Sequence, residues 1–306
     1  MIQQTLPQEV VQDLSTIRDF IRWGVTQFNQ AQLAYGHGTD NAWDESVFLV
    51  LASLHLPPDM DLQVLDAKLI TSEKVMLVER IQQRVTKRIP VPYLIKEAWF
   101  AGLNFYVDER VIIPRSPIAE LIGEEFRPWV SPNDVKNILD MGTGSGCIAI
   151  SAALAFPEAK VDAVDISESA LDVAEINLNR FKIDNVTLIQ SNLFENVPKK
   201  KYDIIVSNPP YVSAQELATL SEEYHHEPLL ALSPGADPLT LVRQILQKAI
   251  NFLTPKGILV VEVGFSQSLL EKEFPGVPFT WLQFASGGEG VFLLTHDELQ
   301  EYTQSS

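Results

Sequence analysis

The sequence predicts an α/β protein in which a small helical domain precedes a mostly parallel, doubly wound sheet. In the second part of the chain, short apolar runs rich in Val, Ile and Leu alternate with segments of helical periodicity. Such alternation is typical of a parallel sheet whose strands are joined by helices. The first 96 residues show helical spacing only.

The composition is that of an ordinary globular protein, with 306 residues, 46% of them hydrophobic and 21% charged. This length allows two domains. The N-terminus lacks the basic-then-apolar pattern of a signal peptide, and the longest apolar run, Cys147 to Phe156, is too short to span a membrane. Cys147 is the single cysteine, which excludes a disulfide framework. We therefore expect a soluble cytoplasmic protein that does not bind membranes.

The acidic balance of the chain bears on its partners, because the formal net charge is −17. Residues 130–306 hold 23 acidic and 11 basic residues, a net of −12, whereas residues 1–129 hold 17 and 12, a net of −5. Such a surface repels a phosphate backbone and attracts a basic protein. We expect a basic protein partner rather than free DNA or RNA, although the acidity could also serve solubility alone.

Three helices are expected in the N-terminal part of the chain. Apolar residues at helical spacing predict a helix over 8–35, a second helix over 43–54 stops at Pro57-Pro58, and a third covers 72–88. Residues 97–113 change period and predict two strands, which turn either at Asp108-Glu109 or around Gly102. A linker helix is expected over 116–127.

Seven strands are expected after residue 130, and helices lie between most of them. The predicted strands are 137–141, 161–166, 186–190, 202–207, 258–263, 279–284 and 291–295, and the predicted helices include 146–155, 168–180 and 238–253. Only a glycine-rich loop separates the last two strands, so these two should form an antiparallel hairpin.

Asn208-Pro209-Pro210-Tyr211 directly follows the apolar run 202–207. Proline lacks the amide donor and fixes φ, so the strand cannot continue. The stretch presents an amide side chain, free carbonyls and an aromatic ring at the carboxyl edge of the sheet, where open α/β folds bind ligands. These groups could hold a planar NH2 by its two hydrogens. A proline-rich turn without chemistry is the alternative.

A glycine-rich loop, Gly142-Thr143-Gly144-Ser145-Gly146, follows the strand 137–141 and leads into an apolar helix. Its glycines let the backbone approach a ligand closely. Asp140 beside the loop would repel a phosphate but can pair with an ammonium group, and Cys147 stands where a dinucleotide fingerprint has Gly or Ala. The loop favours a ligand with an amino-acid tail, with nucleotide binding as the alternative.

The ends of the second and third strands add two further candidate contacts. Asp165, followed by Ile166, lies 19 residues past Gly146, where a carboxylate can accept both hydroxyls of a ribose. Asp165 could instead cap the next helix, but Ser167 can do so by itself. After the third strand, Asn192 could bond the exocyclic amine of a base, and Leu193 or Phe194 could cover its ring.

These features together resemble the class I S-adenosylmethionine-dependent methyltransferases, whose sheet is seven-stranded and Rossmann-like. Within them the chain is similar to the HemK/PrmB family of protein glutamine methyltransferases, over nearly its whole length. The segments that carry this likeness are Trp99-Phe100-Ala101-Gly102, Phe105-Tyr106-Val107, Ile113-Pro114-Arg115-Ser116-Pro117, the glycine-rich loop, Asn208-Pro209-Pro210-Tyr211, His226-Glu227-Pro228 and Gly235-Ala236-Asp237. Tyr35 to Asn41 and Arg115-Ser116-Pro117-Ile118 resemble the PrmB branch.

The resemblance implies methyl transfer from S-adenosyl-L-methionine to a glutamine side chain in the third protein of the large ribosomal subunit. It implies a helical substrate-recognition domain (1–96), a hairpin with a linker helix (97–129) and a methyltransferase domain (130–306). The implied cofactor contacts are Asp140, Gly142, Thr143, Gly144, Ser145, Gly146, Asp165, Ile166, Asn192, Leu193 and Asn208. Asn192 departs from the aspartate usual in the family, and Pro238 replaces a usual glycine.

The expected catalytic residues are Asn208, Pro209 and Tyr211. The Asn208 side-chain oxygen and the Pro209 carbonyl would accept the two N–H bonds of the target amide, and Tyr211 would pack on its plane. Pro210 completes the substrate contacts. Phe100 and Arg115 would either lie near the mouth of the site or pin the linker to the core.

Three rival functions remain open from the sequence: a release-factor glutamine methyltransferase, an amino-methyltransferase for adenine or guanine in nucleic acid, and a protein that binds the cofactor without catalysis. A flipped base also presents a planar NH2, but the acidic charge disfavours it. His225-His226-Glu227 has no spaced partner ligands, so no metal is expected. His37 is expected as a loop contact.

Overall fold

The computed structural model describes residues 7–285 and 287–305. The segment 1–6, which shows no signal-peptide pattern, lies outside the described residues, as do Ser286 and Ser306. The chain forms two compact units. The first comprises residues up to Glu97 together with Ser221–His226, and the second comprises Ala98–Leu220 and Glu227–Ser306. No helix within 7–285 and 287–305 is both long and apolar enough to cross a lipid bilayer.

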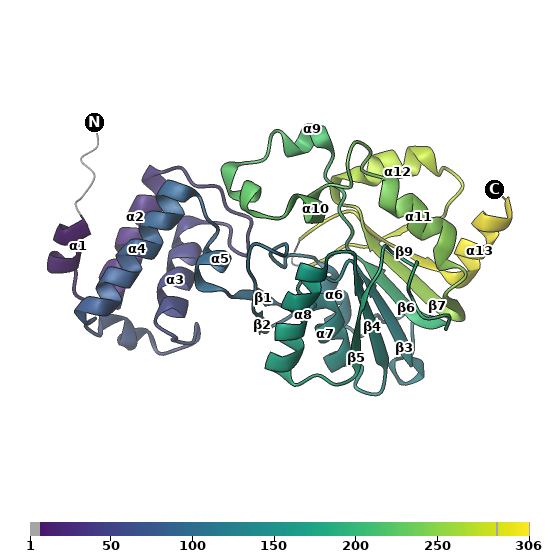
Figure 1. Ribbon diagram of the computed structural model, residues 1–306, viewed down its shortest axis with the longest axis horizontal. Helices are drawn as coiled ribbons and strands as arrows, with labels where there is room; N and C mark the ends of the chain where they lie inside the picture. Colours follow the sequence, from purple (N-terminus) through teal and green to yellow (C-terminus); the bar gives the residue numbers. More distant parts are fainter. Residues whose placement is uncertain (1–6, 286, 306) are drawn as a thin grey trace. The chain divides into compact units, whose positions relative to one another are not determined.

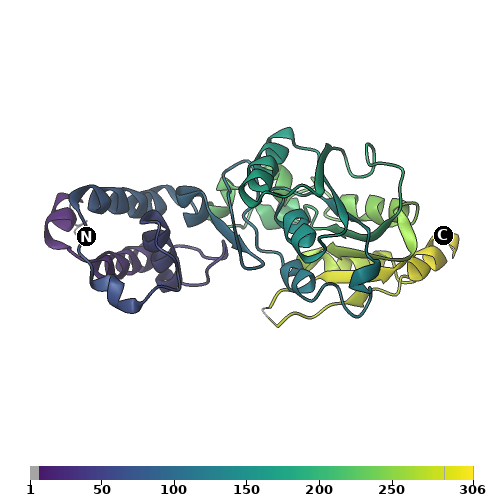
Figure 2. The ribbon, with the colours of Figure 1, turned by 90° about the horizontal axis from the view of Figure 1, so that it is seen from below.

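The first unit is helical. Its elements are α1 (Pro7–Asp13), α2 (Ile17–Gln30), α3 (Ala42–Ser53), η1 (Leu62–Asp66), α4 (Thr71–Lys87), α5 (Val91–Ile95) and η3 (Glu222–His226). Helices α2, α3 and α4 pack side by side around a core that includes Phe20, Leu49 and Leu77 (Figures 1 and 2).

The single helix predicted over 8–35 is wrong, because the chain breaks between Asp13 and Ile17. Thr16 caps α2: its hydroxyl oxygen accepts from the Asp19 amide at 3.2 Å, and the Asp19 carboxylate accepts from the Thr16 amide at 2.8 Å. This reciprocal capping box satisfies two amides that a continuous helix would have bonded internally. The apolar spacing continues across the break, so periodicity alone does not reveal it.

A buried arginine ties η3 to the other helices of the first unit. Arg84 is fully buried and donates to Glu45 at 2.9 Å, to Glu223 at 3.1 Å and to the carbonyl of Ala34 at 2.7 Å. Glu223 comes from the chain segment after Asn208-Pro209-Pro210-Tyr211, 139 residues beyond Arg84. The helical unit is therefore completed by a segment that the sequence places within the second part of the chain.

The second unit is built on one seven-stranded sheet. Its strands are β3 (Asn137–Met141), β4 (Lys160–Asp165), β5 (Val186–Gln190), β6 (Tyr202–Ser207), β7 (Leu253–Glu262), β8 (Thr280–Trp281) and β9 (Val291–Thr295). Their order is β5-β4-β3-β6-β7-β9-β8, with β3 to β7 parallel and β9 antiparallel to both β7 and β8. The predicted mostly parallel sheet and its terminal antiparallel pair are confirmed, although β8 is short.

Helices cover both faces of this sheet (Figure 1). They are α6 (Ile118–Gly123), α7 (Cys147–Ala155) and α8 (Glu168–Phe181) on one face and α11 (Thr240–Ala249), α12 (Gln267–Glu273) and α13 (His296–Ser305) on the other. Successive strand residues point to opposite faces. Accordingly Ile204 belongs to the core under α7, and Ile205 to the core under α11. The sheet is therefore buried on both sides, as its continuous apolar strands require.

Several predicted boundaries around the sheet change. The strands β1 (Ala98–Phe100) and β2 (Leu103–Phe105) form the hairpin around Gly102, so a strand over 110–113 is wrong. The linker helix ends at Gly123, and the helix expected over 238–253 is confined to Thr240–Ala249. Short helices α9 (Ala214–Leu217) and α10 (Leu229–Leu232) follow the proline-rich stretch.

We predict that Arg84→Met destabilises the helical unit by about 3–5 kcal/mol, because it leaves two buried carboxylates without their shared cation. Hydrogen exchange of peptides from α2, α3 and α4 measures this loss locally in the full chain. Arg18→Ala is the matched control, since Arg18 pairs with Asp66 while their side chains are 50% and 66% exposed. Such an exposed pair contributes less than about 1 kcal/mol. Equal protection in both variants would contradict a stabilising role for the buried cluster.

Candidate active site

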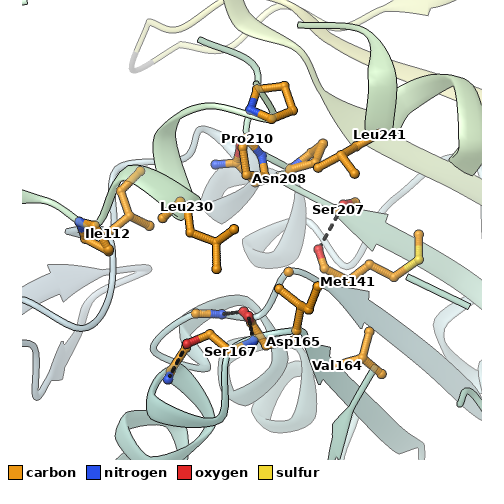
Figure 3. A pocket seen from close by; sticks show the side chains of 18 of the residues that line it. Ile112, Met141, Val164, Asp165, Ser167, Ser207, Asn208, Pro210, Leu230 and Leu241 are labelled. Carbon is orange, nitrogen blue, oxygen red and sulfur yellow. Dashed lines mark hydrogen bonds between the residues drawn. The ribbon is translucent and has the colours of Figure 1, made fainter. Parts of the chain in front are cut away.

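A pocket of about 220 Å³ lies at the carboxyl ends of the parallel strands (Figure 3). The strand order reverses between β3 and β6, since β4 lies on one side of β3 and β6 on the other. Such a switch point is where open α/β sheets bind ligands. The pocket is lined by nine of the residues that the sequence singled out: Gly142, Gly144, Asp165, Ile166, Asn192, Leu193, Asn208, Pro209 and Pro210.

The glycine-rich loop needs its glycines for backbone geometry. Gly142, Gly144 and Gly146 have φ of +74°, +55° and +79°, a region that other residues rarely adopt. The amides of Gly142 and Thr143 both donate to the carbonyl of Val164, at 2.9 and 3.0 Å. The loop thus folds over the end of β4. Thr143, Ser145 and Gly146 do not line the pocket, and a Cβ on Gly146 would lie 3.2 Å from that of Ala174 on α8.

Asp165 holds the loop and faces the pocket at the same time. One carboxylate oxygen accepts from the Gly144 amide and the other from the Ser167 amide, both at 2.9 Å. Burial raises the pKa of Asp165, although these amide bonds lower it. Ser167 itself caps α8 through the Ala170 amide. Each carboxylate oxygen retains a lone pair for a further donor such as a hydroxyl.

Asp140 lies behind the glycine-rich loop and not on the pocket wall. It is fully buried, and its Oδ2 accepts from Thr143 Oγ1 at 2.6 Å and from the Ala149 amide at 3.1 Å. Among the described residues, none donates a hydrogen bond to its Oδ1. Burial raises the pKa of Asp140 to about 7, against the lowering effect of Thr143 and Ala149. One oxygen of a buried carboxyl is thus left without a donor directly beneath the loop.

The end of β5 supplies a third wall of the pocket. Asn192 is exposed, and its amide nitrogen donates to Glu195 at 3.0 Å. Its side-chain oxygen is the atom that could accept from an amine. Leu193 lines the pocket with φ of +48°, whereas Phe194 is buried in the core and stacks on Phe252 with 4.7 Å between ring centroids. Of the two residues suggested to cover a base, Leu193 is therefore the one at the pocket.

Asn208 lies across the pocket from Asp165 (Figure 3). Asn208 directly follows the last residue of β6, Ser207. The Ser207 hydroxyl donates to the Met141 carbonyl at 2.8 Å, which ties the end of β6 to β3 and so fixes the position of Asn208. Within the part of the chain that the structure describes, no residue forms a hydrogen bond with the Asn208 side-chain amide or donates to the Pro209 carbonyl. The pocket edge therefore presents two acceptors without protein donors, one of them on a buried proline.

Tyr211 follows Pro210 but does not line the pocket. Its hydroxyl donates to Glu262 at 2.8 Å, and its carbonyl accepts from Ser266 Oγ at 3.3 Å. Both partners come from the end of β7 and from η4 (Gly264–Ser266), the short helix that follows it. The aromatic ring is thus attached to the strand beside β6.

Phe100 and Arg115 both make contacts inside the second unit. Phe100 is 4% exposed and packs against Phe105 in the core under α7. Arg115 donates to both carboxylate oxygens of Glu227, at 2.6 and 2.7 Å, and the amide of Ile113 donates to the same carboxylate at 3.0 Å. These contacts correspond to the pinning role that the sequence left open as an alternative.

The Glu227 pair brings together two pocket walls that the sequence did not identify. One wall is formed by residues 110–112, and the other by residues between 228 and 234, including the exposed Leu230. Glu227 is 5% exposed and joins these segments across 112 residues of sequence. The motif His226-Glu227-Pro228 was the sequence signal for this second wall. Its role could not be inferred from the sequence, because its partner Arg115 is too distant in the chain.

The residues described contain no group of three or more His, Cys, Asp and Glu side chains that could hold a metal ion. His226 instead donates to the Lys87 carbonyl at 2.7 Å within the helical unit. His37 is buried there against Tyr224, with 4.4 Å between ring centroids.

We predict that Asp140→Asn changes how stability depends on pH. Burial raises the pKa of Asp140 from its ordinary value of 3.8 to about 7, so the folded state binds the proton more tightly than the unfolded chain. The stability that protonated Asp140 contributes to the wild-type protein should therefore be lost as pH rises from about 4 to about 7. The neutral variant lacks this loss. Urea unfolding between pH 5 and pH 8 measures it, with Asp59→Asn, at an exposed position, as the control for one removed charge. Parallel profiles for Asp140→Asn and the wild type would contradict the prediction.

Comparison with known proteins identifies the family. Residues 128–275 match the model of the methyltransferase small domain. The chain is 47% identical to the ribosomal protein uL3 glutamine methyltransferase of Francisella tularensis, covering 99% of this chain and 97% of that protein. It is 51% identical to the protein of the same name from Bordetella pertussis, covering 94% and 97%.

A solved structure shows the same fold at low sequence identity. It is the hMettl16 catalytic domain in complex with MAT2A 3′UTR hairpin 6, with a TM-score of 0.51, 16% identity, and coverage of 73% of this chain and 81% of that one. The seven-stranded sheet is that of the class I methyltransferases, and the predicted fold class is confirmed. With the two relatives matched over nearly their whole length, this chain belongs to the family of ribosomal protein uL3 glutamine methyltransferases.

Proposed function

We propose that this protein transfers a methyl group from S-adenosyl-L-methionine to the side-chain amide nitrogen of a glutamine in ribosomal protein uL3. The observation that carries the proposal is the pair of acceptors at the pocket edge, the Asn208 side-chain oxygen and the Pro209 carbonyl. Neither has a protein donor among the described residues. A primary amide has two N–H donors on one planar nitrogen, which matches two acceptors held on a rigid backbone.

The residues of the pocket fit the cofactor. Asp165 retains lone pairs for the ribose hydroxyls, and Leu193 with Ile166 offers apolar cover for a base. Gly142 and Gly144, which follow Met141, add no side chains to the wall beyond the end of β3. Asp140, with an oxygen that no described residue bonds, lies beneath the loop, where a bound ammonium group would favour its ionised form. Thr143, Ser145 and Gly146 would act by shaping the loop, and Asn192 by its amide oxygen.

The cofactor supplies an electrophilic methyl group on a positively charged sulfur. An amide nitrogen is a poor nucleophile, because its lone pair is delocalised into the carbonyl. Acceptors on both N–H bonds would hold the nitrogen in line with that methyl group and stabilise the positive charge that develops on it. The new N–C bond replaces the S–C bond, the sulfur becomes neutral, and the extra proton leaves the nitrogen for water. Tyr211 would border the plane of the amide.

The substrate assignment rests on the two named relatives and on charge. A net charge of −17 favours association with a basic ribosomal protein. We further propose that the helical unit recognises this protein, and that the reaction takes place in the cytoplasm, where ribosomal proteins are made. Trp43, 52% exposed at the start of α3, is an apolar side chain available for such a contact. Methylation of a nucleic-acid base is disfavoured, because binding a phosphate backbone requires a basic surface.

We predict that Asn208→Ala lowers turnover at least about 100-fold, because one of the two acceptors for the target amide is lost. Cofactor affinity should stay nearly unchanged, since Asp165 and the glycine-rich loop are untouched. Single-turnover methyl transfer and calorimetric titration of the cofactor separate these effects. Asn133→Ala is the matched control, because Asn133 precedes β3 in the chain and does not line the pocket. Unchanged turnover in Asn208→Ala would overturn the catalytic assignment.

A radiolabelled transfer assay tests the substrate. The full chain is incubated with labelled S-adenosyl-L-methionine and, separately, with ribosomal protein uL3, a release factor, or ribosomal RNA. We expect label in uL3, located on a glutamine by mass spectrometry, and none in an uL3 variant with that glutamine replaced. Label only in the release factor or only in RNA would show that the substrate proposal is wrong while leaving methyl transfer intact.

A further inference from the structure

Tyr211 is held at three points by residues from the end of β7 and from η4, the short helix that follows it. Its hydroxyl donates to Glu262, its carbonyl accepts from Ser266, and its ring lies against Gly264. The three contacts together fix both the direction and the tilt of the ring.

Glu262 is placed for this role by the register of the sheet. Val261 on β7 is opposite Ser207 on β6, so Glu262 leaves the sheet at the same edge as Asn208. The side chain is 6% exposed, and both carboxylate oxygens accept hydrogen bonds, Oε1 from Tyr211 at 2.8 Å and Oε2 from Ser116 Oγ at 2.5 Å. Ser116 therefore orients the Glu262 carboxylate through the oxygen that Tyr211 does not use. A rotation of the carboxylate would leave the buried Ser116 hydroxyl without its acceptor.

Gly264 supplies a flat surface for the ring. Its φ is +48°, and a Cβ at this position would lie 2.6 Å from Tyr211 Cε2. No side chain fits there while the ring keeps its place. The bare backbone of Gly264 and the carboxylate of Glu262 thus select one position of the phenol.

We propose that Glu262 is a positioning residue for methyl transfer, which acts through the hydroxyl of Tyr211 to hold that ring against the target amide. The inference rests on the proposed function of Asn208-Pro209-Pro210-Tyr211. Glu262 contacts neither the methyl donor nor the amide in this role. Its removal changes the rate of the chemical step through the geometry of Tyr211 and leaves the cofactor pocket intact, since Glu262 does not line that pocket.

The experiment measures kcat with uL3 and the dissociation constant of S-adenosyl-L-methionine for four forms of the full chain: wild type, Glu262→Ala, Tyr211→Phe and the double variant. Each single variant should lower kcat about 10- to 100-fold, the size of effect expected when a positioning contact shifts by about 1 Å. The dissociation constant should change less than about twofold. Because both variants remove the same hydrogen bond, the double variant should be no slower than the slower single variant.

Glu262→Gln and Glu158→Gln are the matched controls. The amide oxygen that Glu262→Gln introduces can still accept from Tyr211, so this variant should recover most of the rate lost in Glu262→Ala. Glu158 is exposed before β4, at the amino edge of the sheet, and Glu158→Gln should behave as the wild type.

Losses that multiply in the double variant, or a Glu262→Ala variant as fast as the wild type, would overturn the inference. A thermal unfolding curve checks that each variant is folded. If Glu262→Ala does not fold, Tyr211→Phe decides alone, because it removes the same bond and keeps the carboxylate, and an unchanged kcat would then refute the proposal. A wild-type chain that transfers no methyl group to uL3 would instead refute the proposed function.

Discussion

The pairing of β3 with β6 at the centre of the sheet is the constraint on which the site depends. These strands are far apart in sequence, yet their register sets Met141 opposite Ser207, and the Ser207 hydroxyl donates to the Met141 carbonyl. The residues that follow each strand therefore leave the sheet at the same point. One exit is the glycine-rich loop, and the other is Asn208 with its prolines. Every pocket contact on these two walls follows from this single register.

Buried carboxylates then fix the irregular segments around that edge. Glu227 joins Arg115 to the segment after His226, and Glu262 joins Ser116 to Tyr211. A loop has no neighbouring strand to pair its backbone N–H groups, so buried amides in a loop need side-chain acceptors. Both glutamates bond the short segment Ile113 to Ser116. That segment consequently has two anchors, and its neighbours at 110–112 form a pocket wall without being a strand.

The sequence was sufficient for features that depend on neighbours in the chain. Apolar runs identified the central strands, and the residues that end them, such as Asp165 and Asn208, were identified because a parallel sheet collects its strand ends at one edge. The break before α2 was missed for a local reason, because the apolar spacing continues through the capping residue Thr16. The other failures arise where a distant partner decides. The attachment of Glu223 to Arg84, and of Arg115 to Glu227, requires the tertiary structure itself.

The charges at the pocket argue for a cationic ligand. Arg110 lines the pocket, but its guanidinium donates twice to Asp108, at 2.9 and 2.7 Å. Burial opposes ionisation of Asp108, yet these bonds hold its pKa at about 2, so at physiological pH an ionised Asp108 balances the positive charge of Arg110. Asp165 faces the pocket and Asp140 lies beneath the loop. A phosphate would be repelled by the ionised forms of these two carboxyls, whereas a sulfonium with an ammonium tail would favour those forms and be stabilised by them. Electrostatics and the acceptor pair at Asn208 thus favour the same reaction.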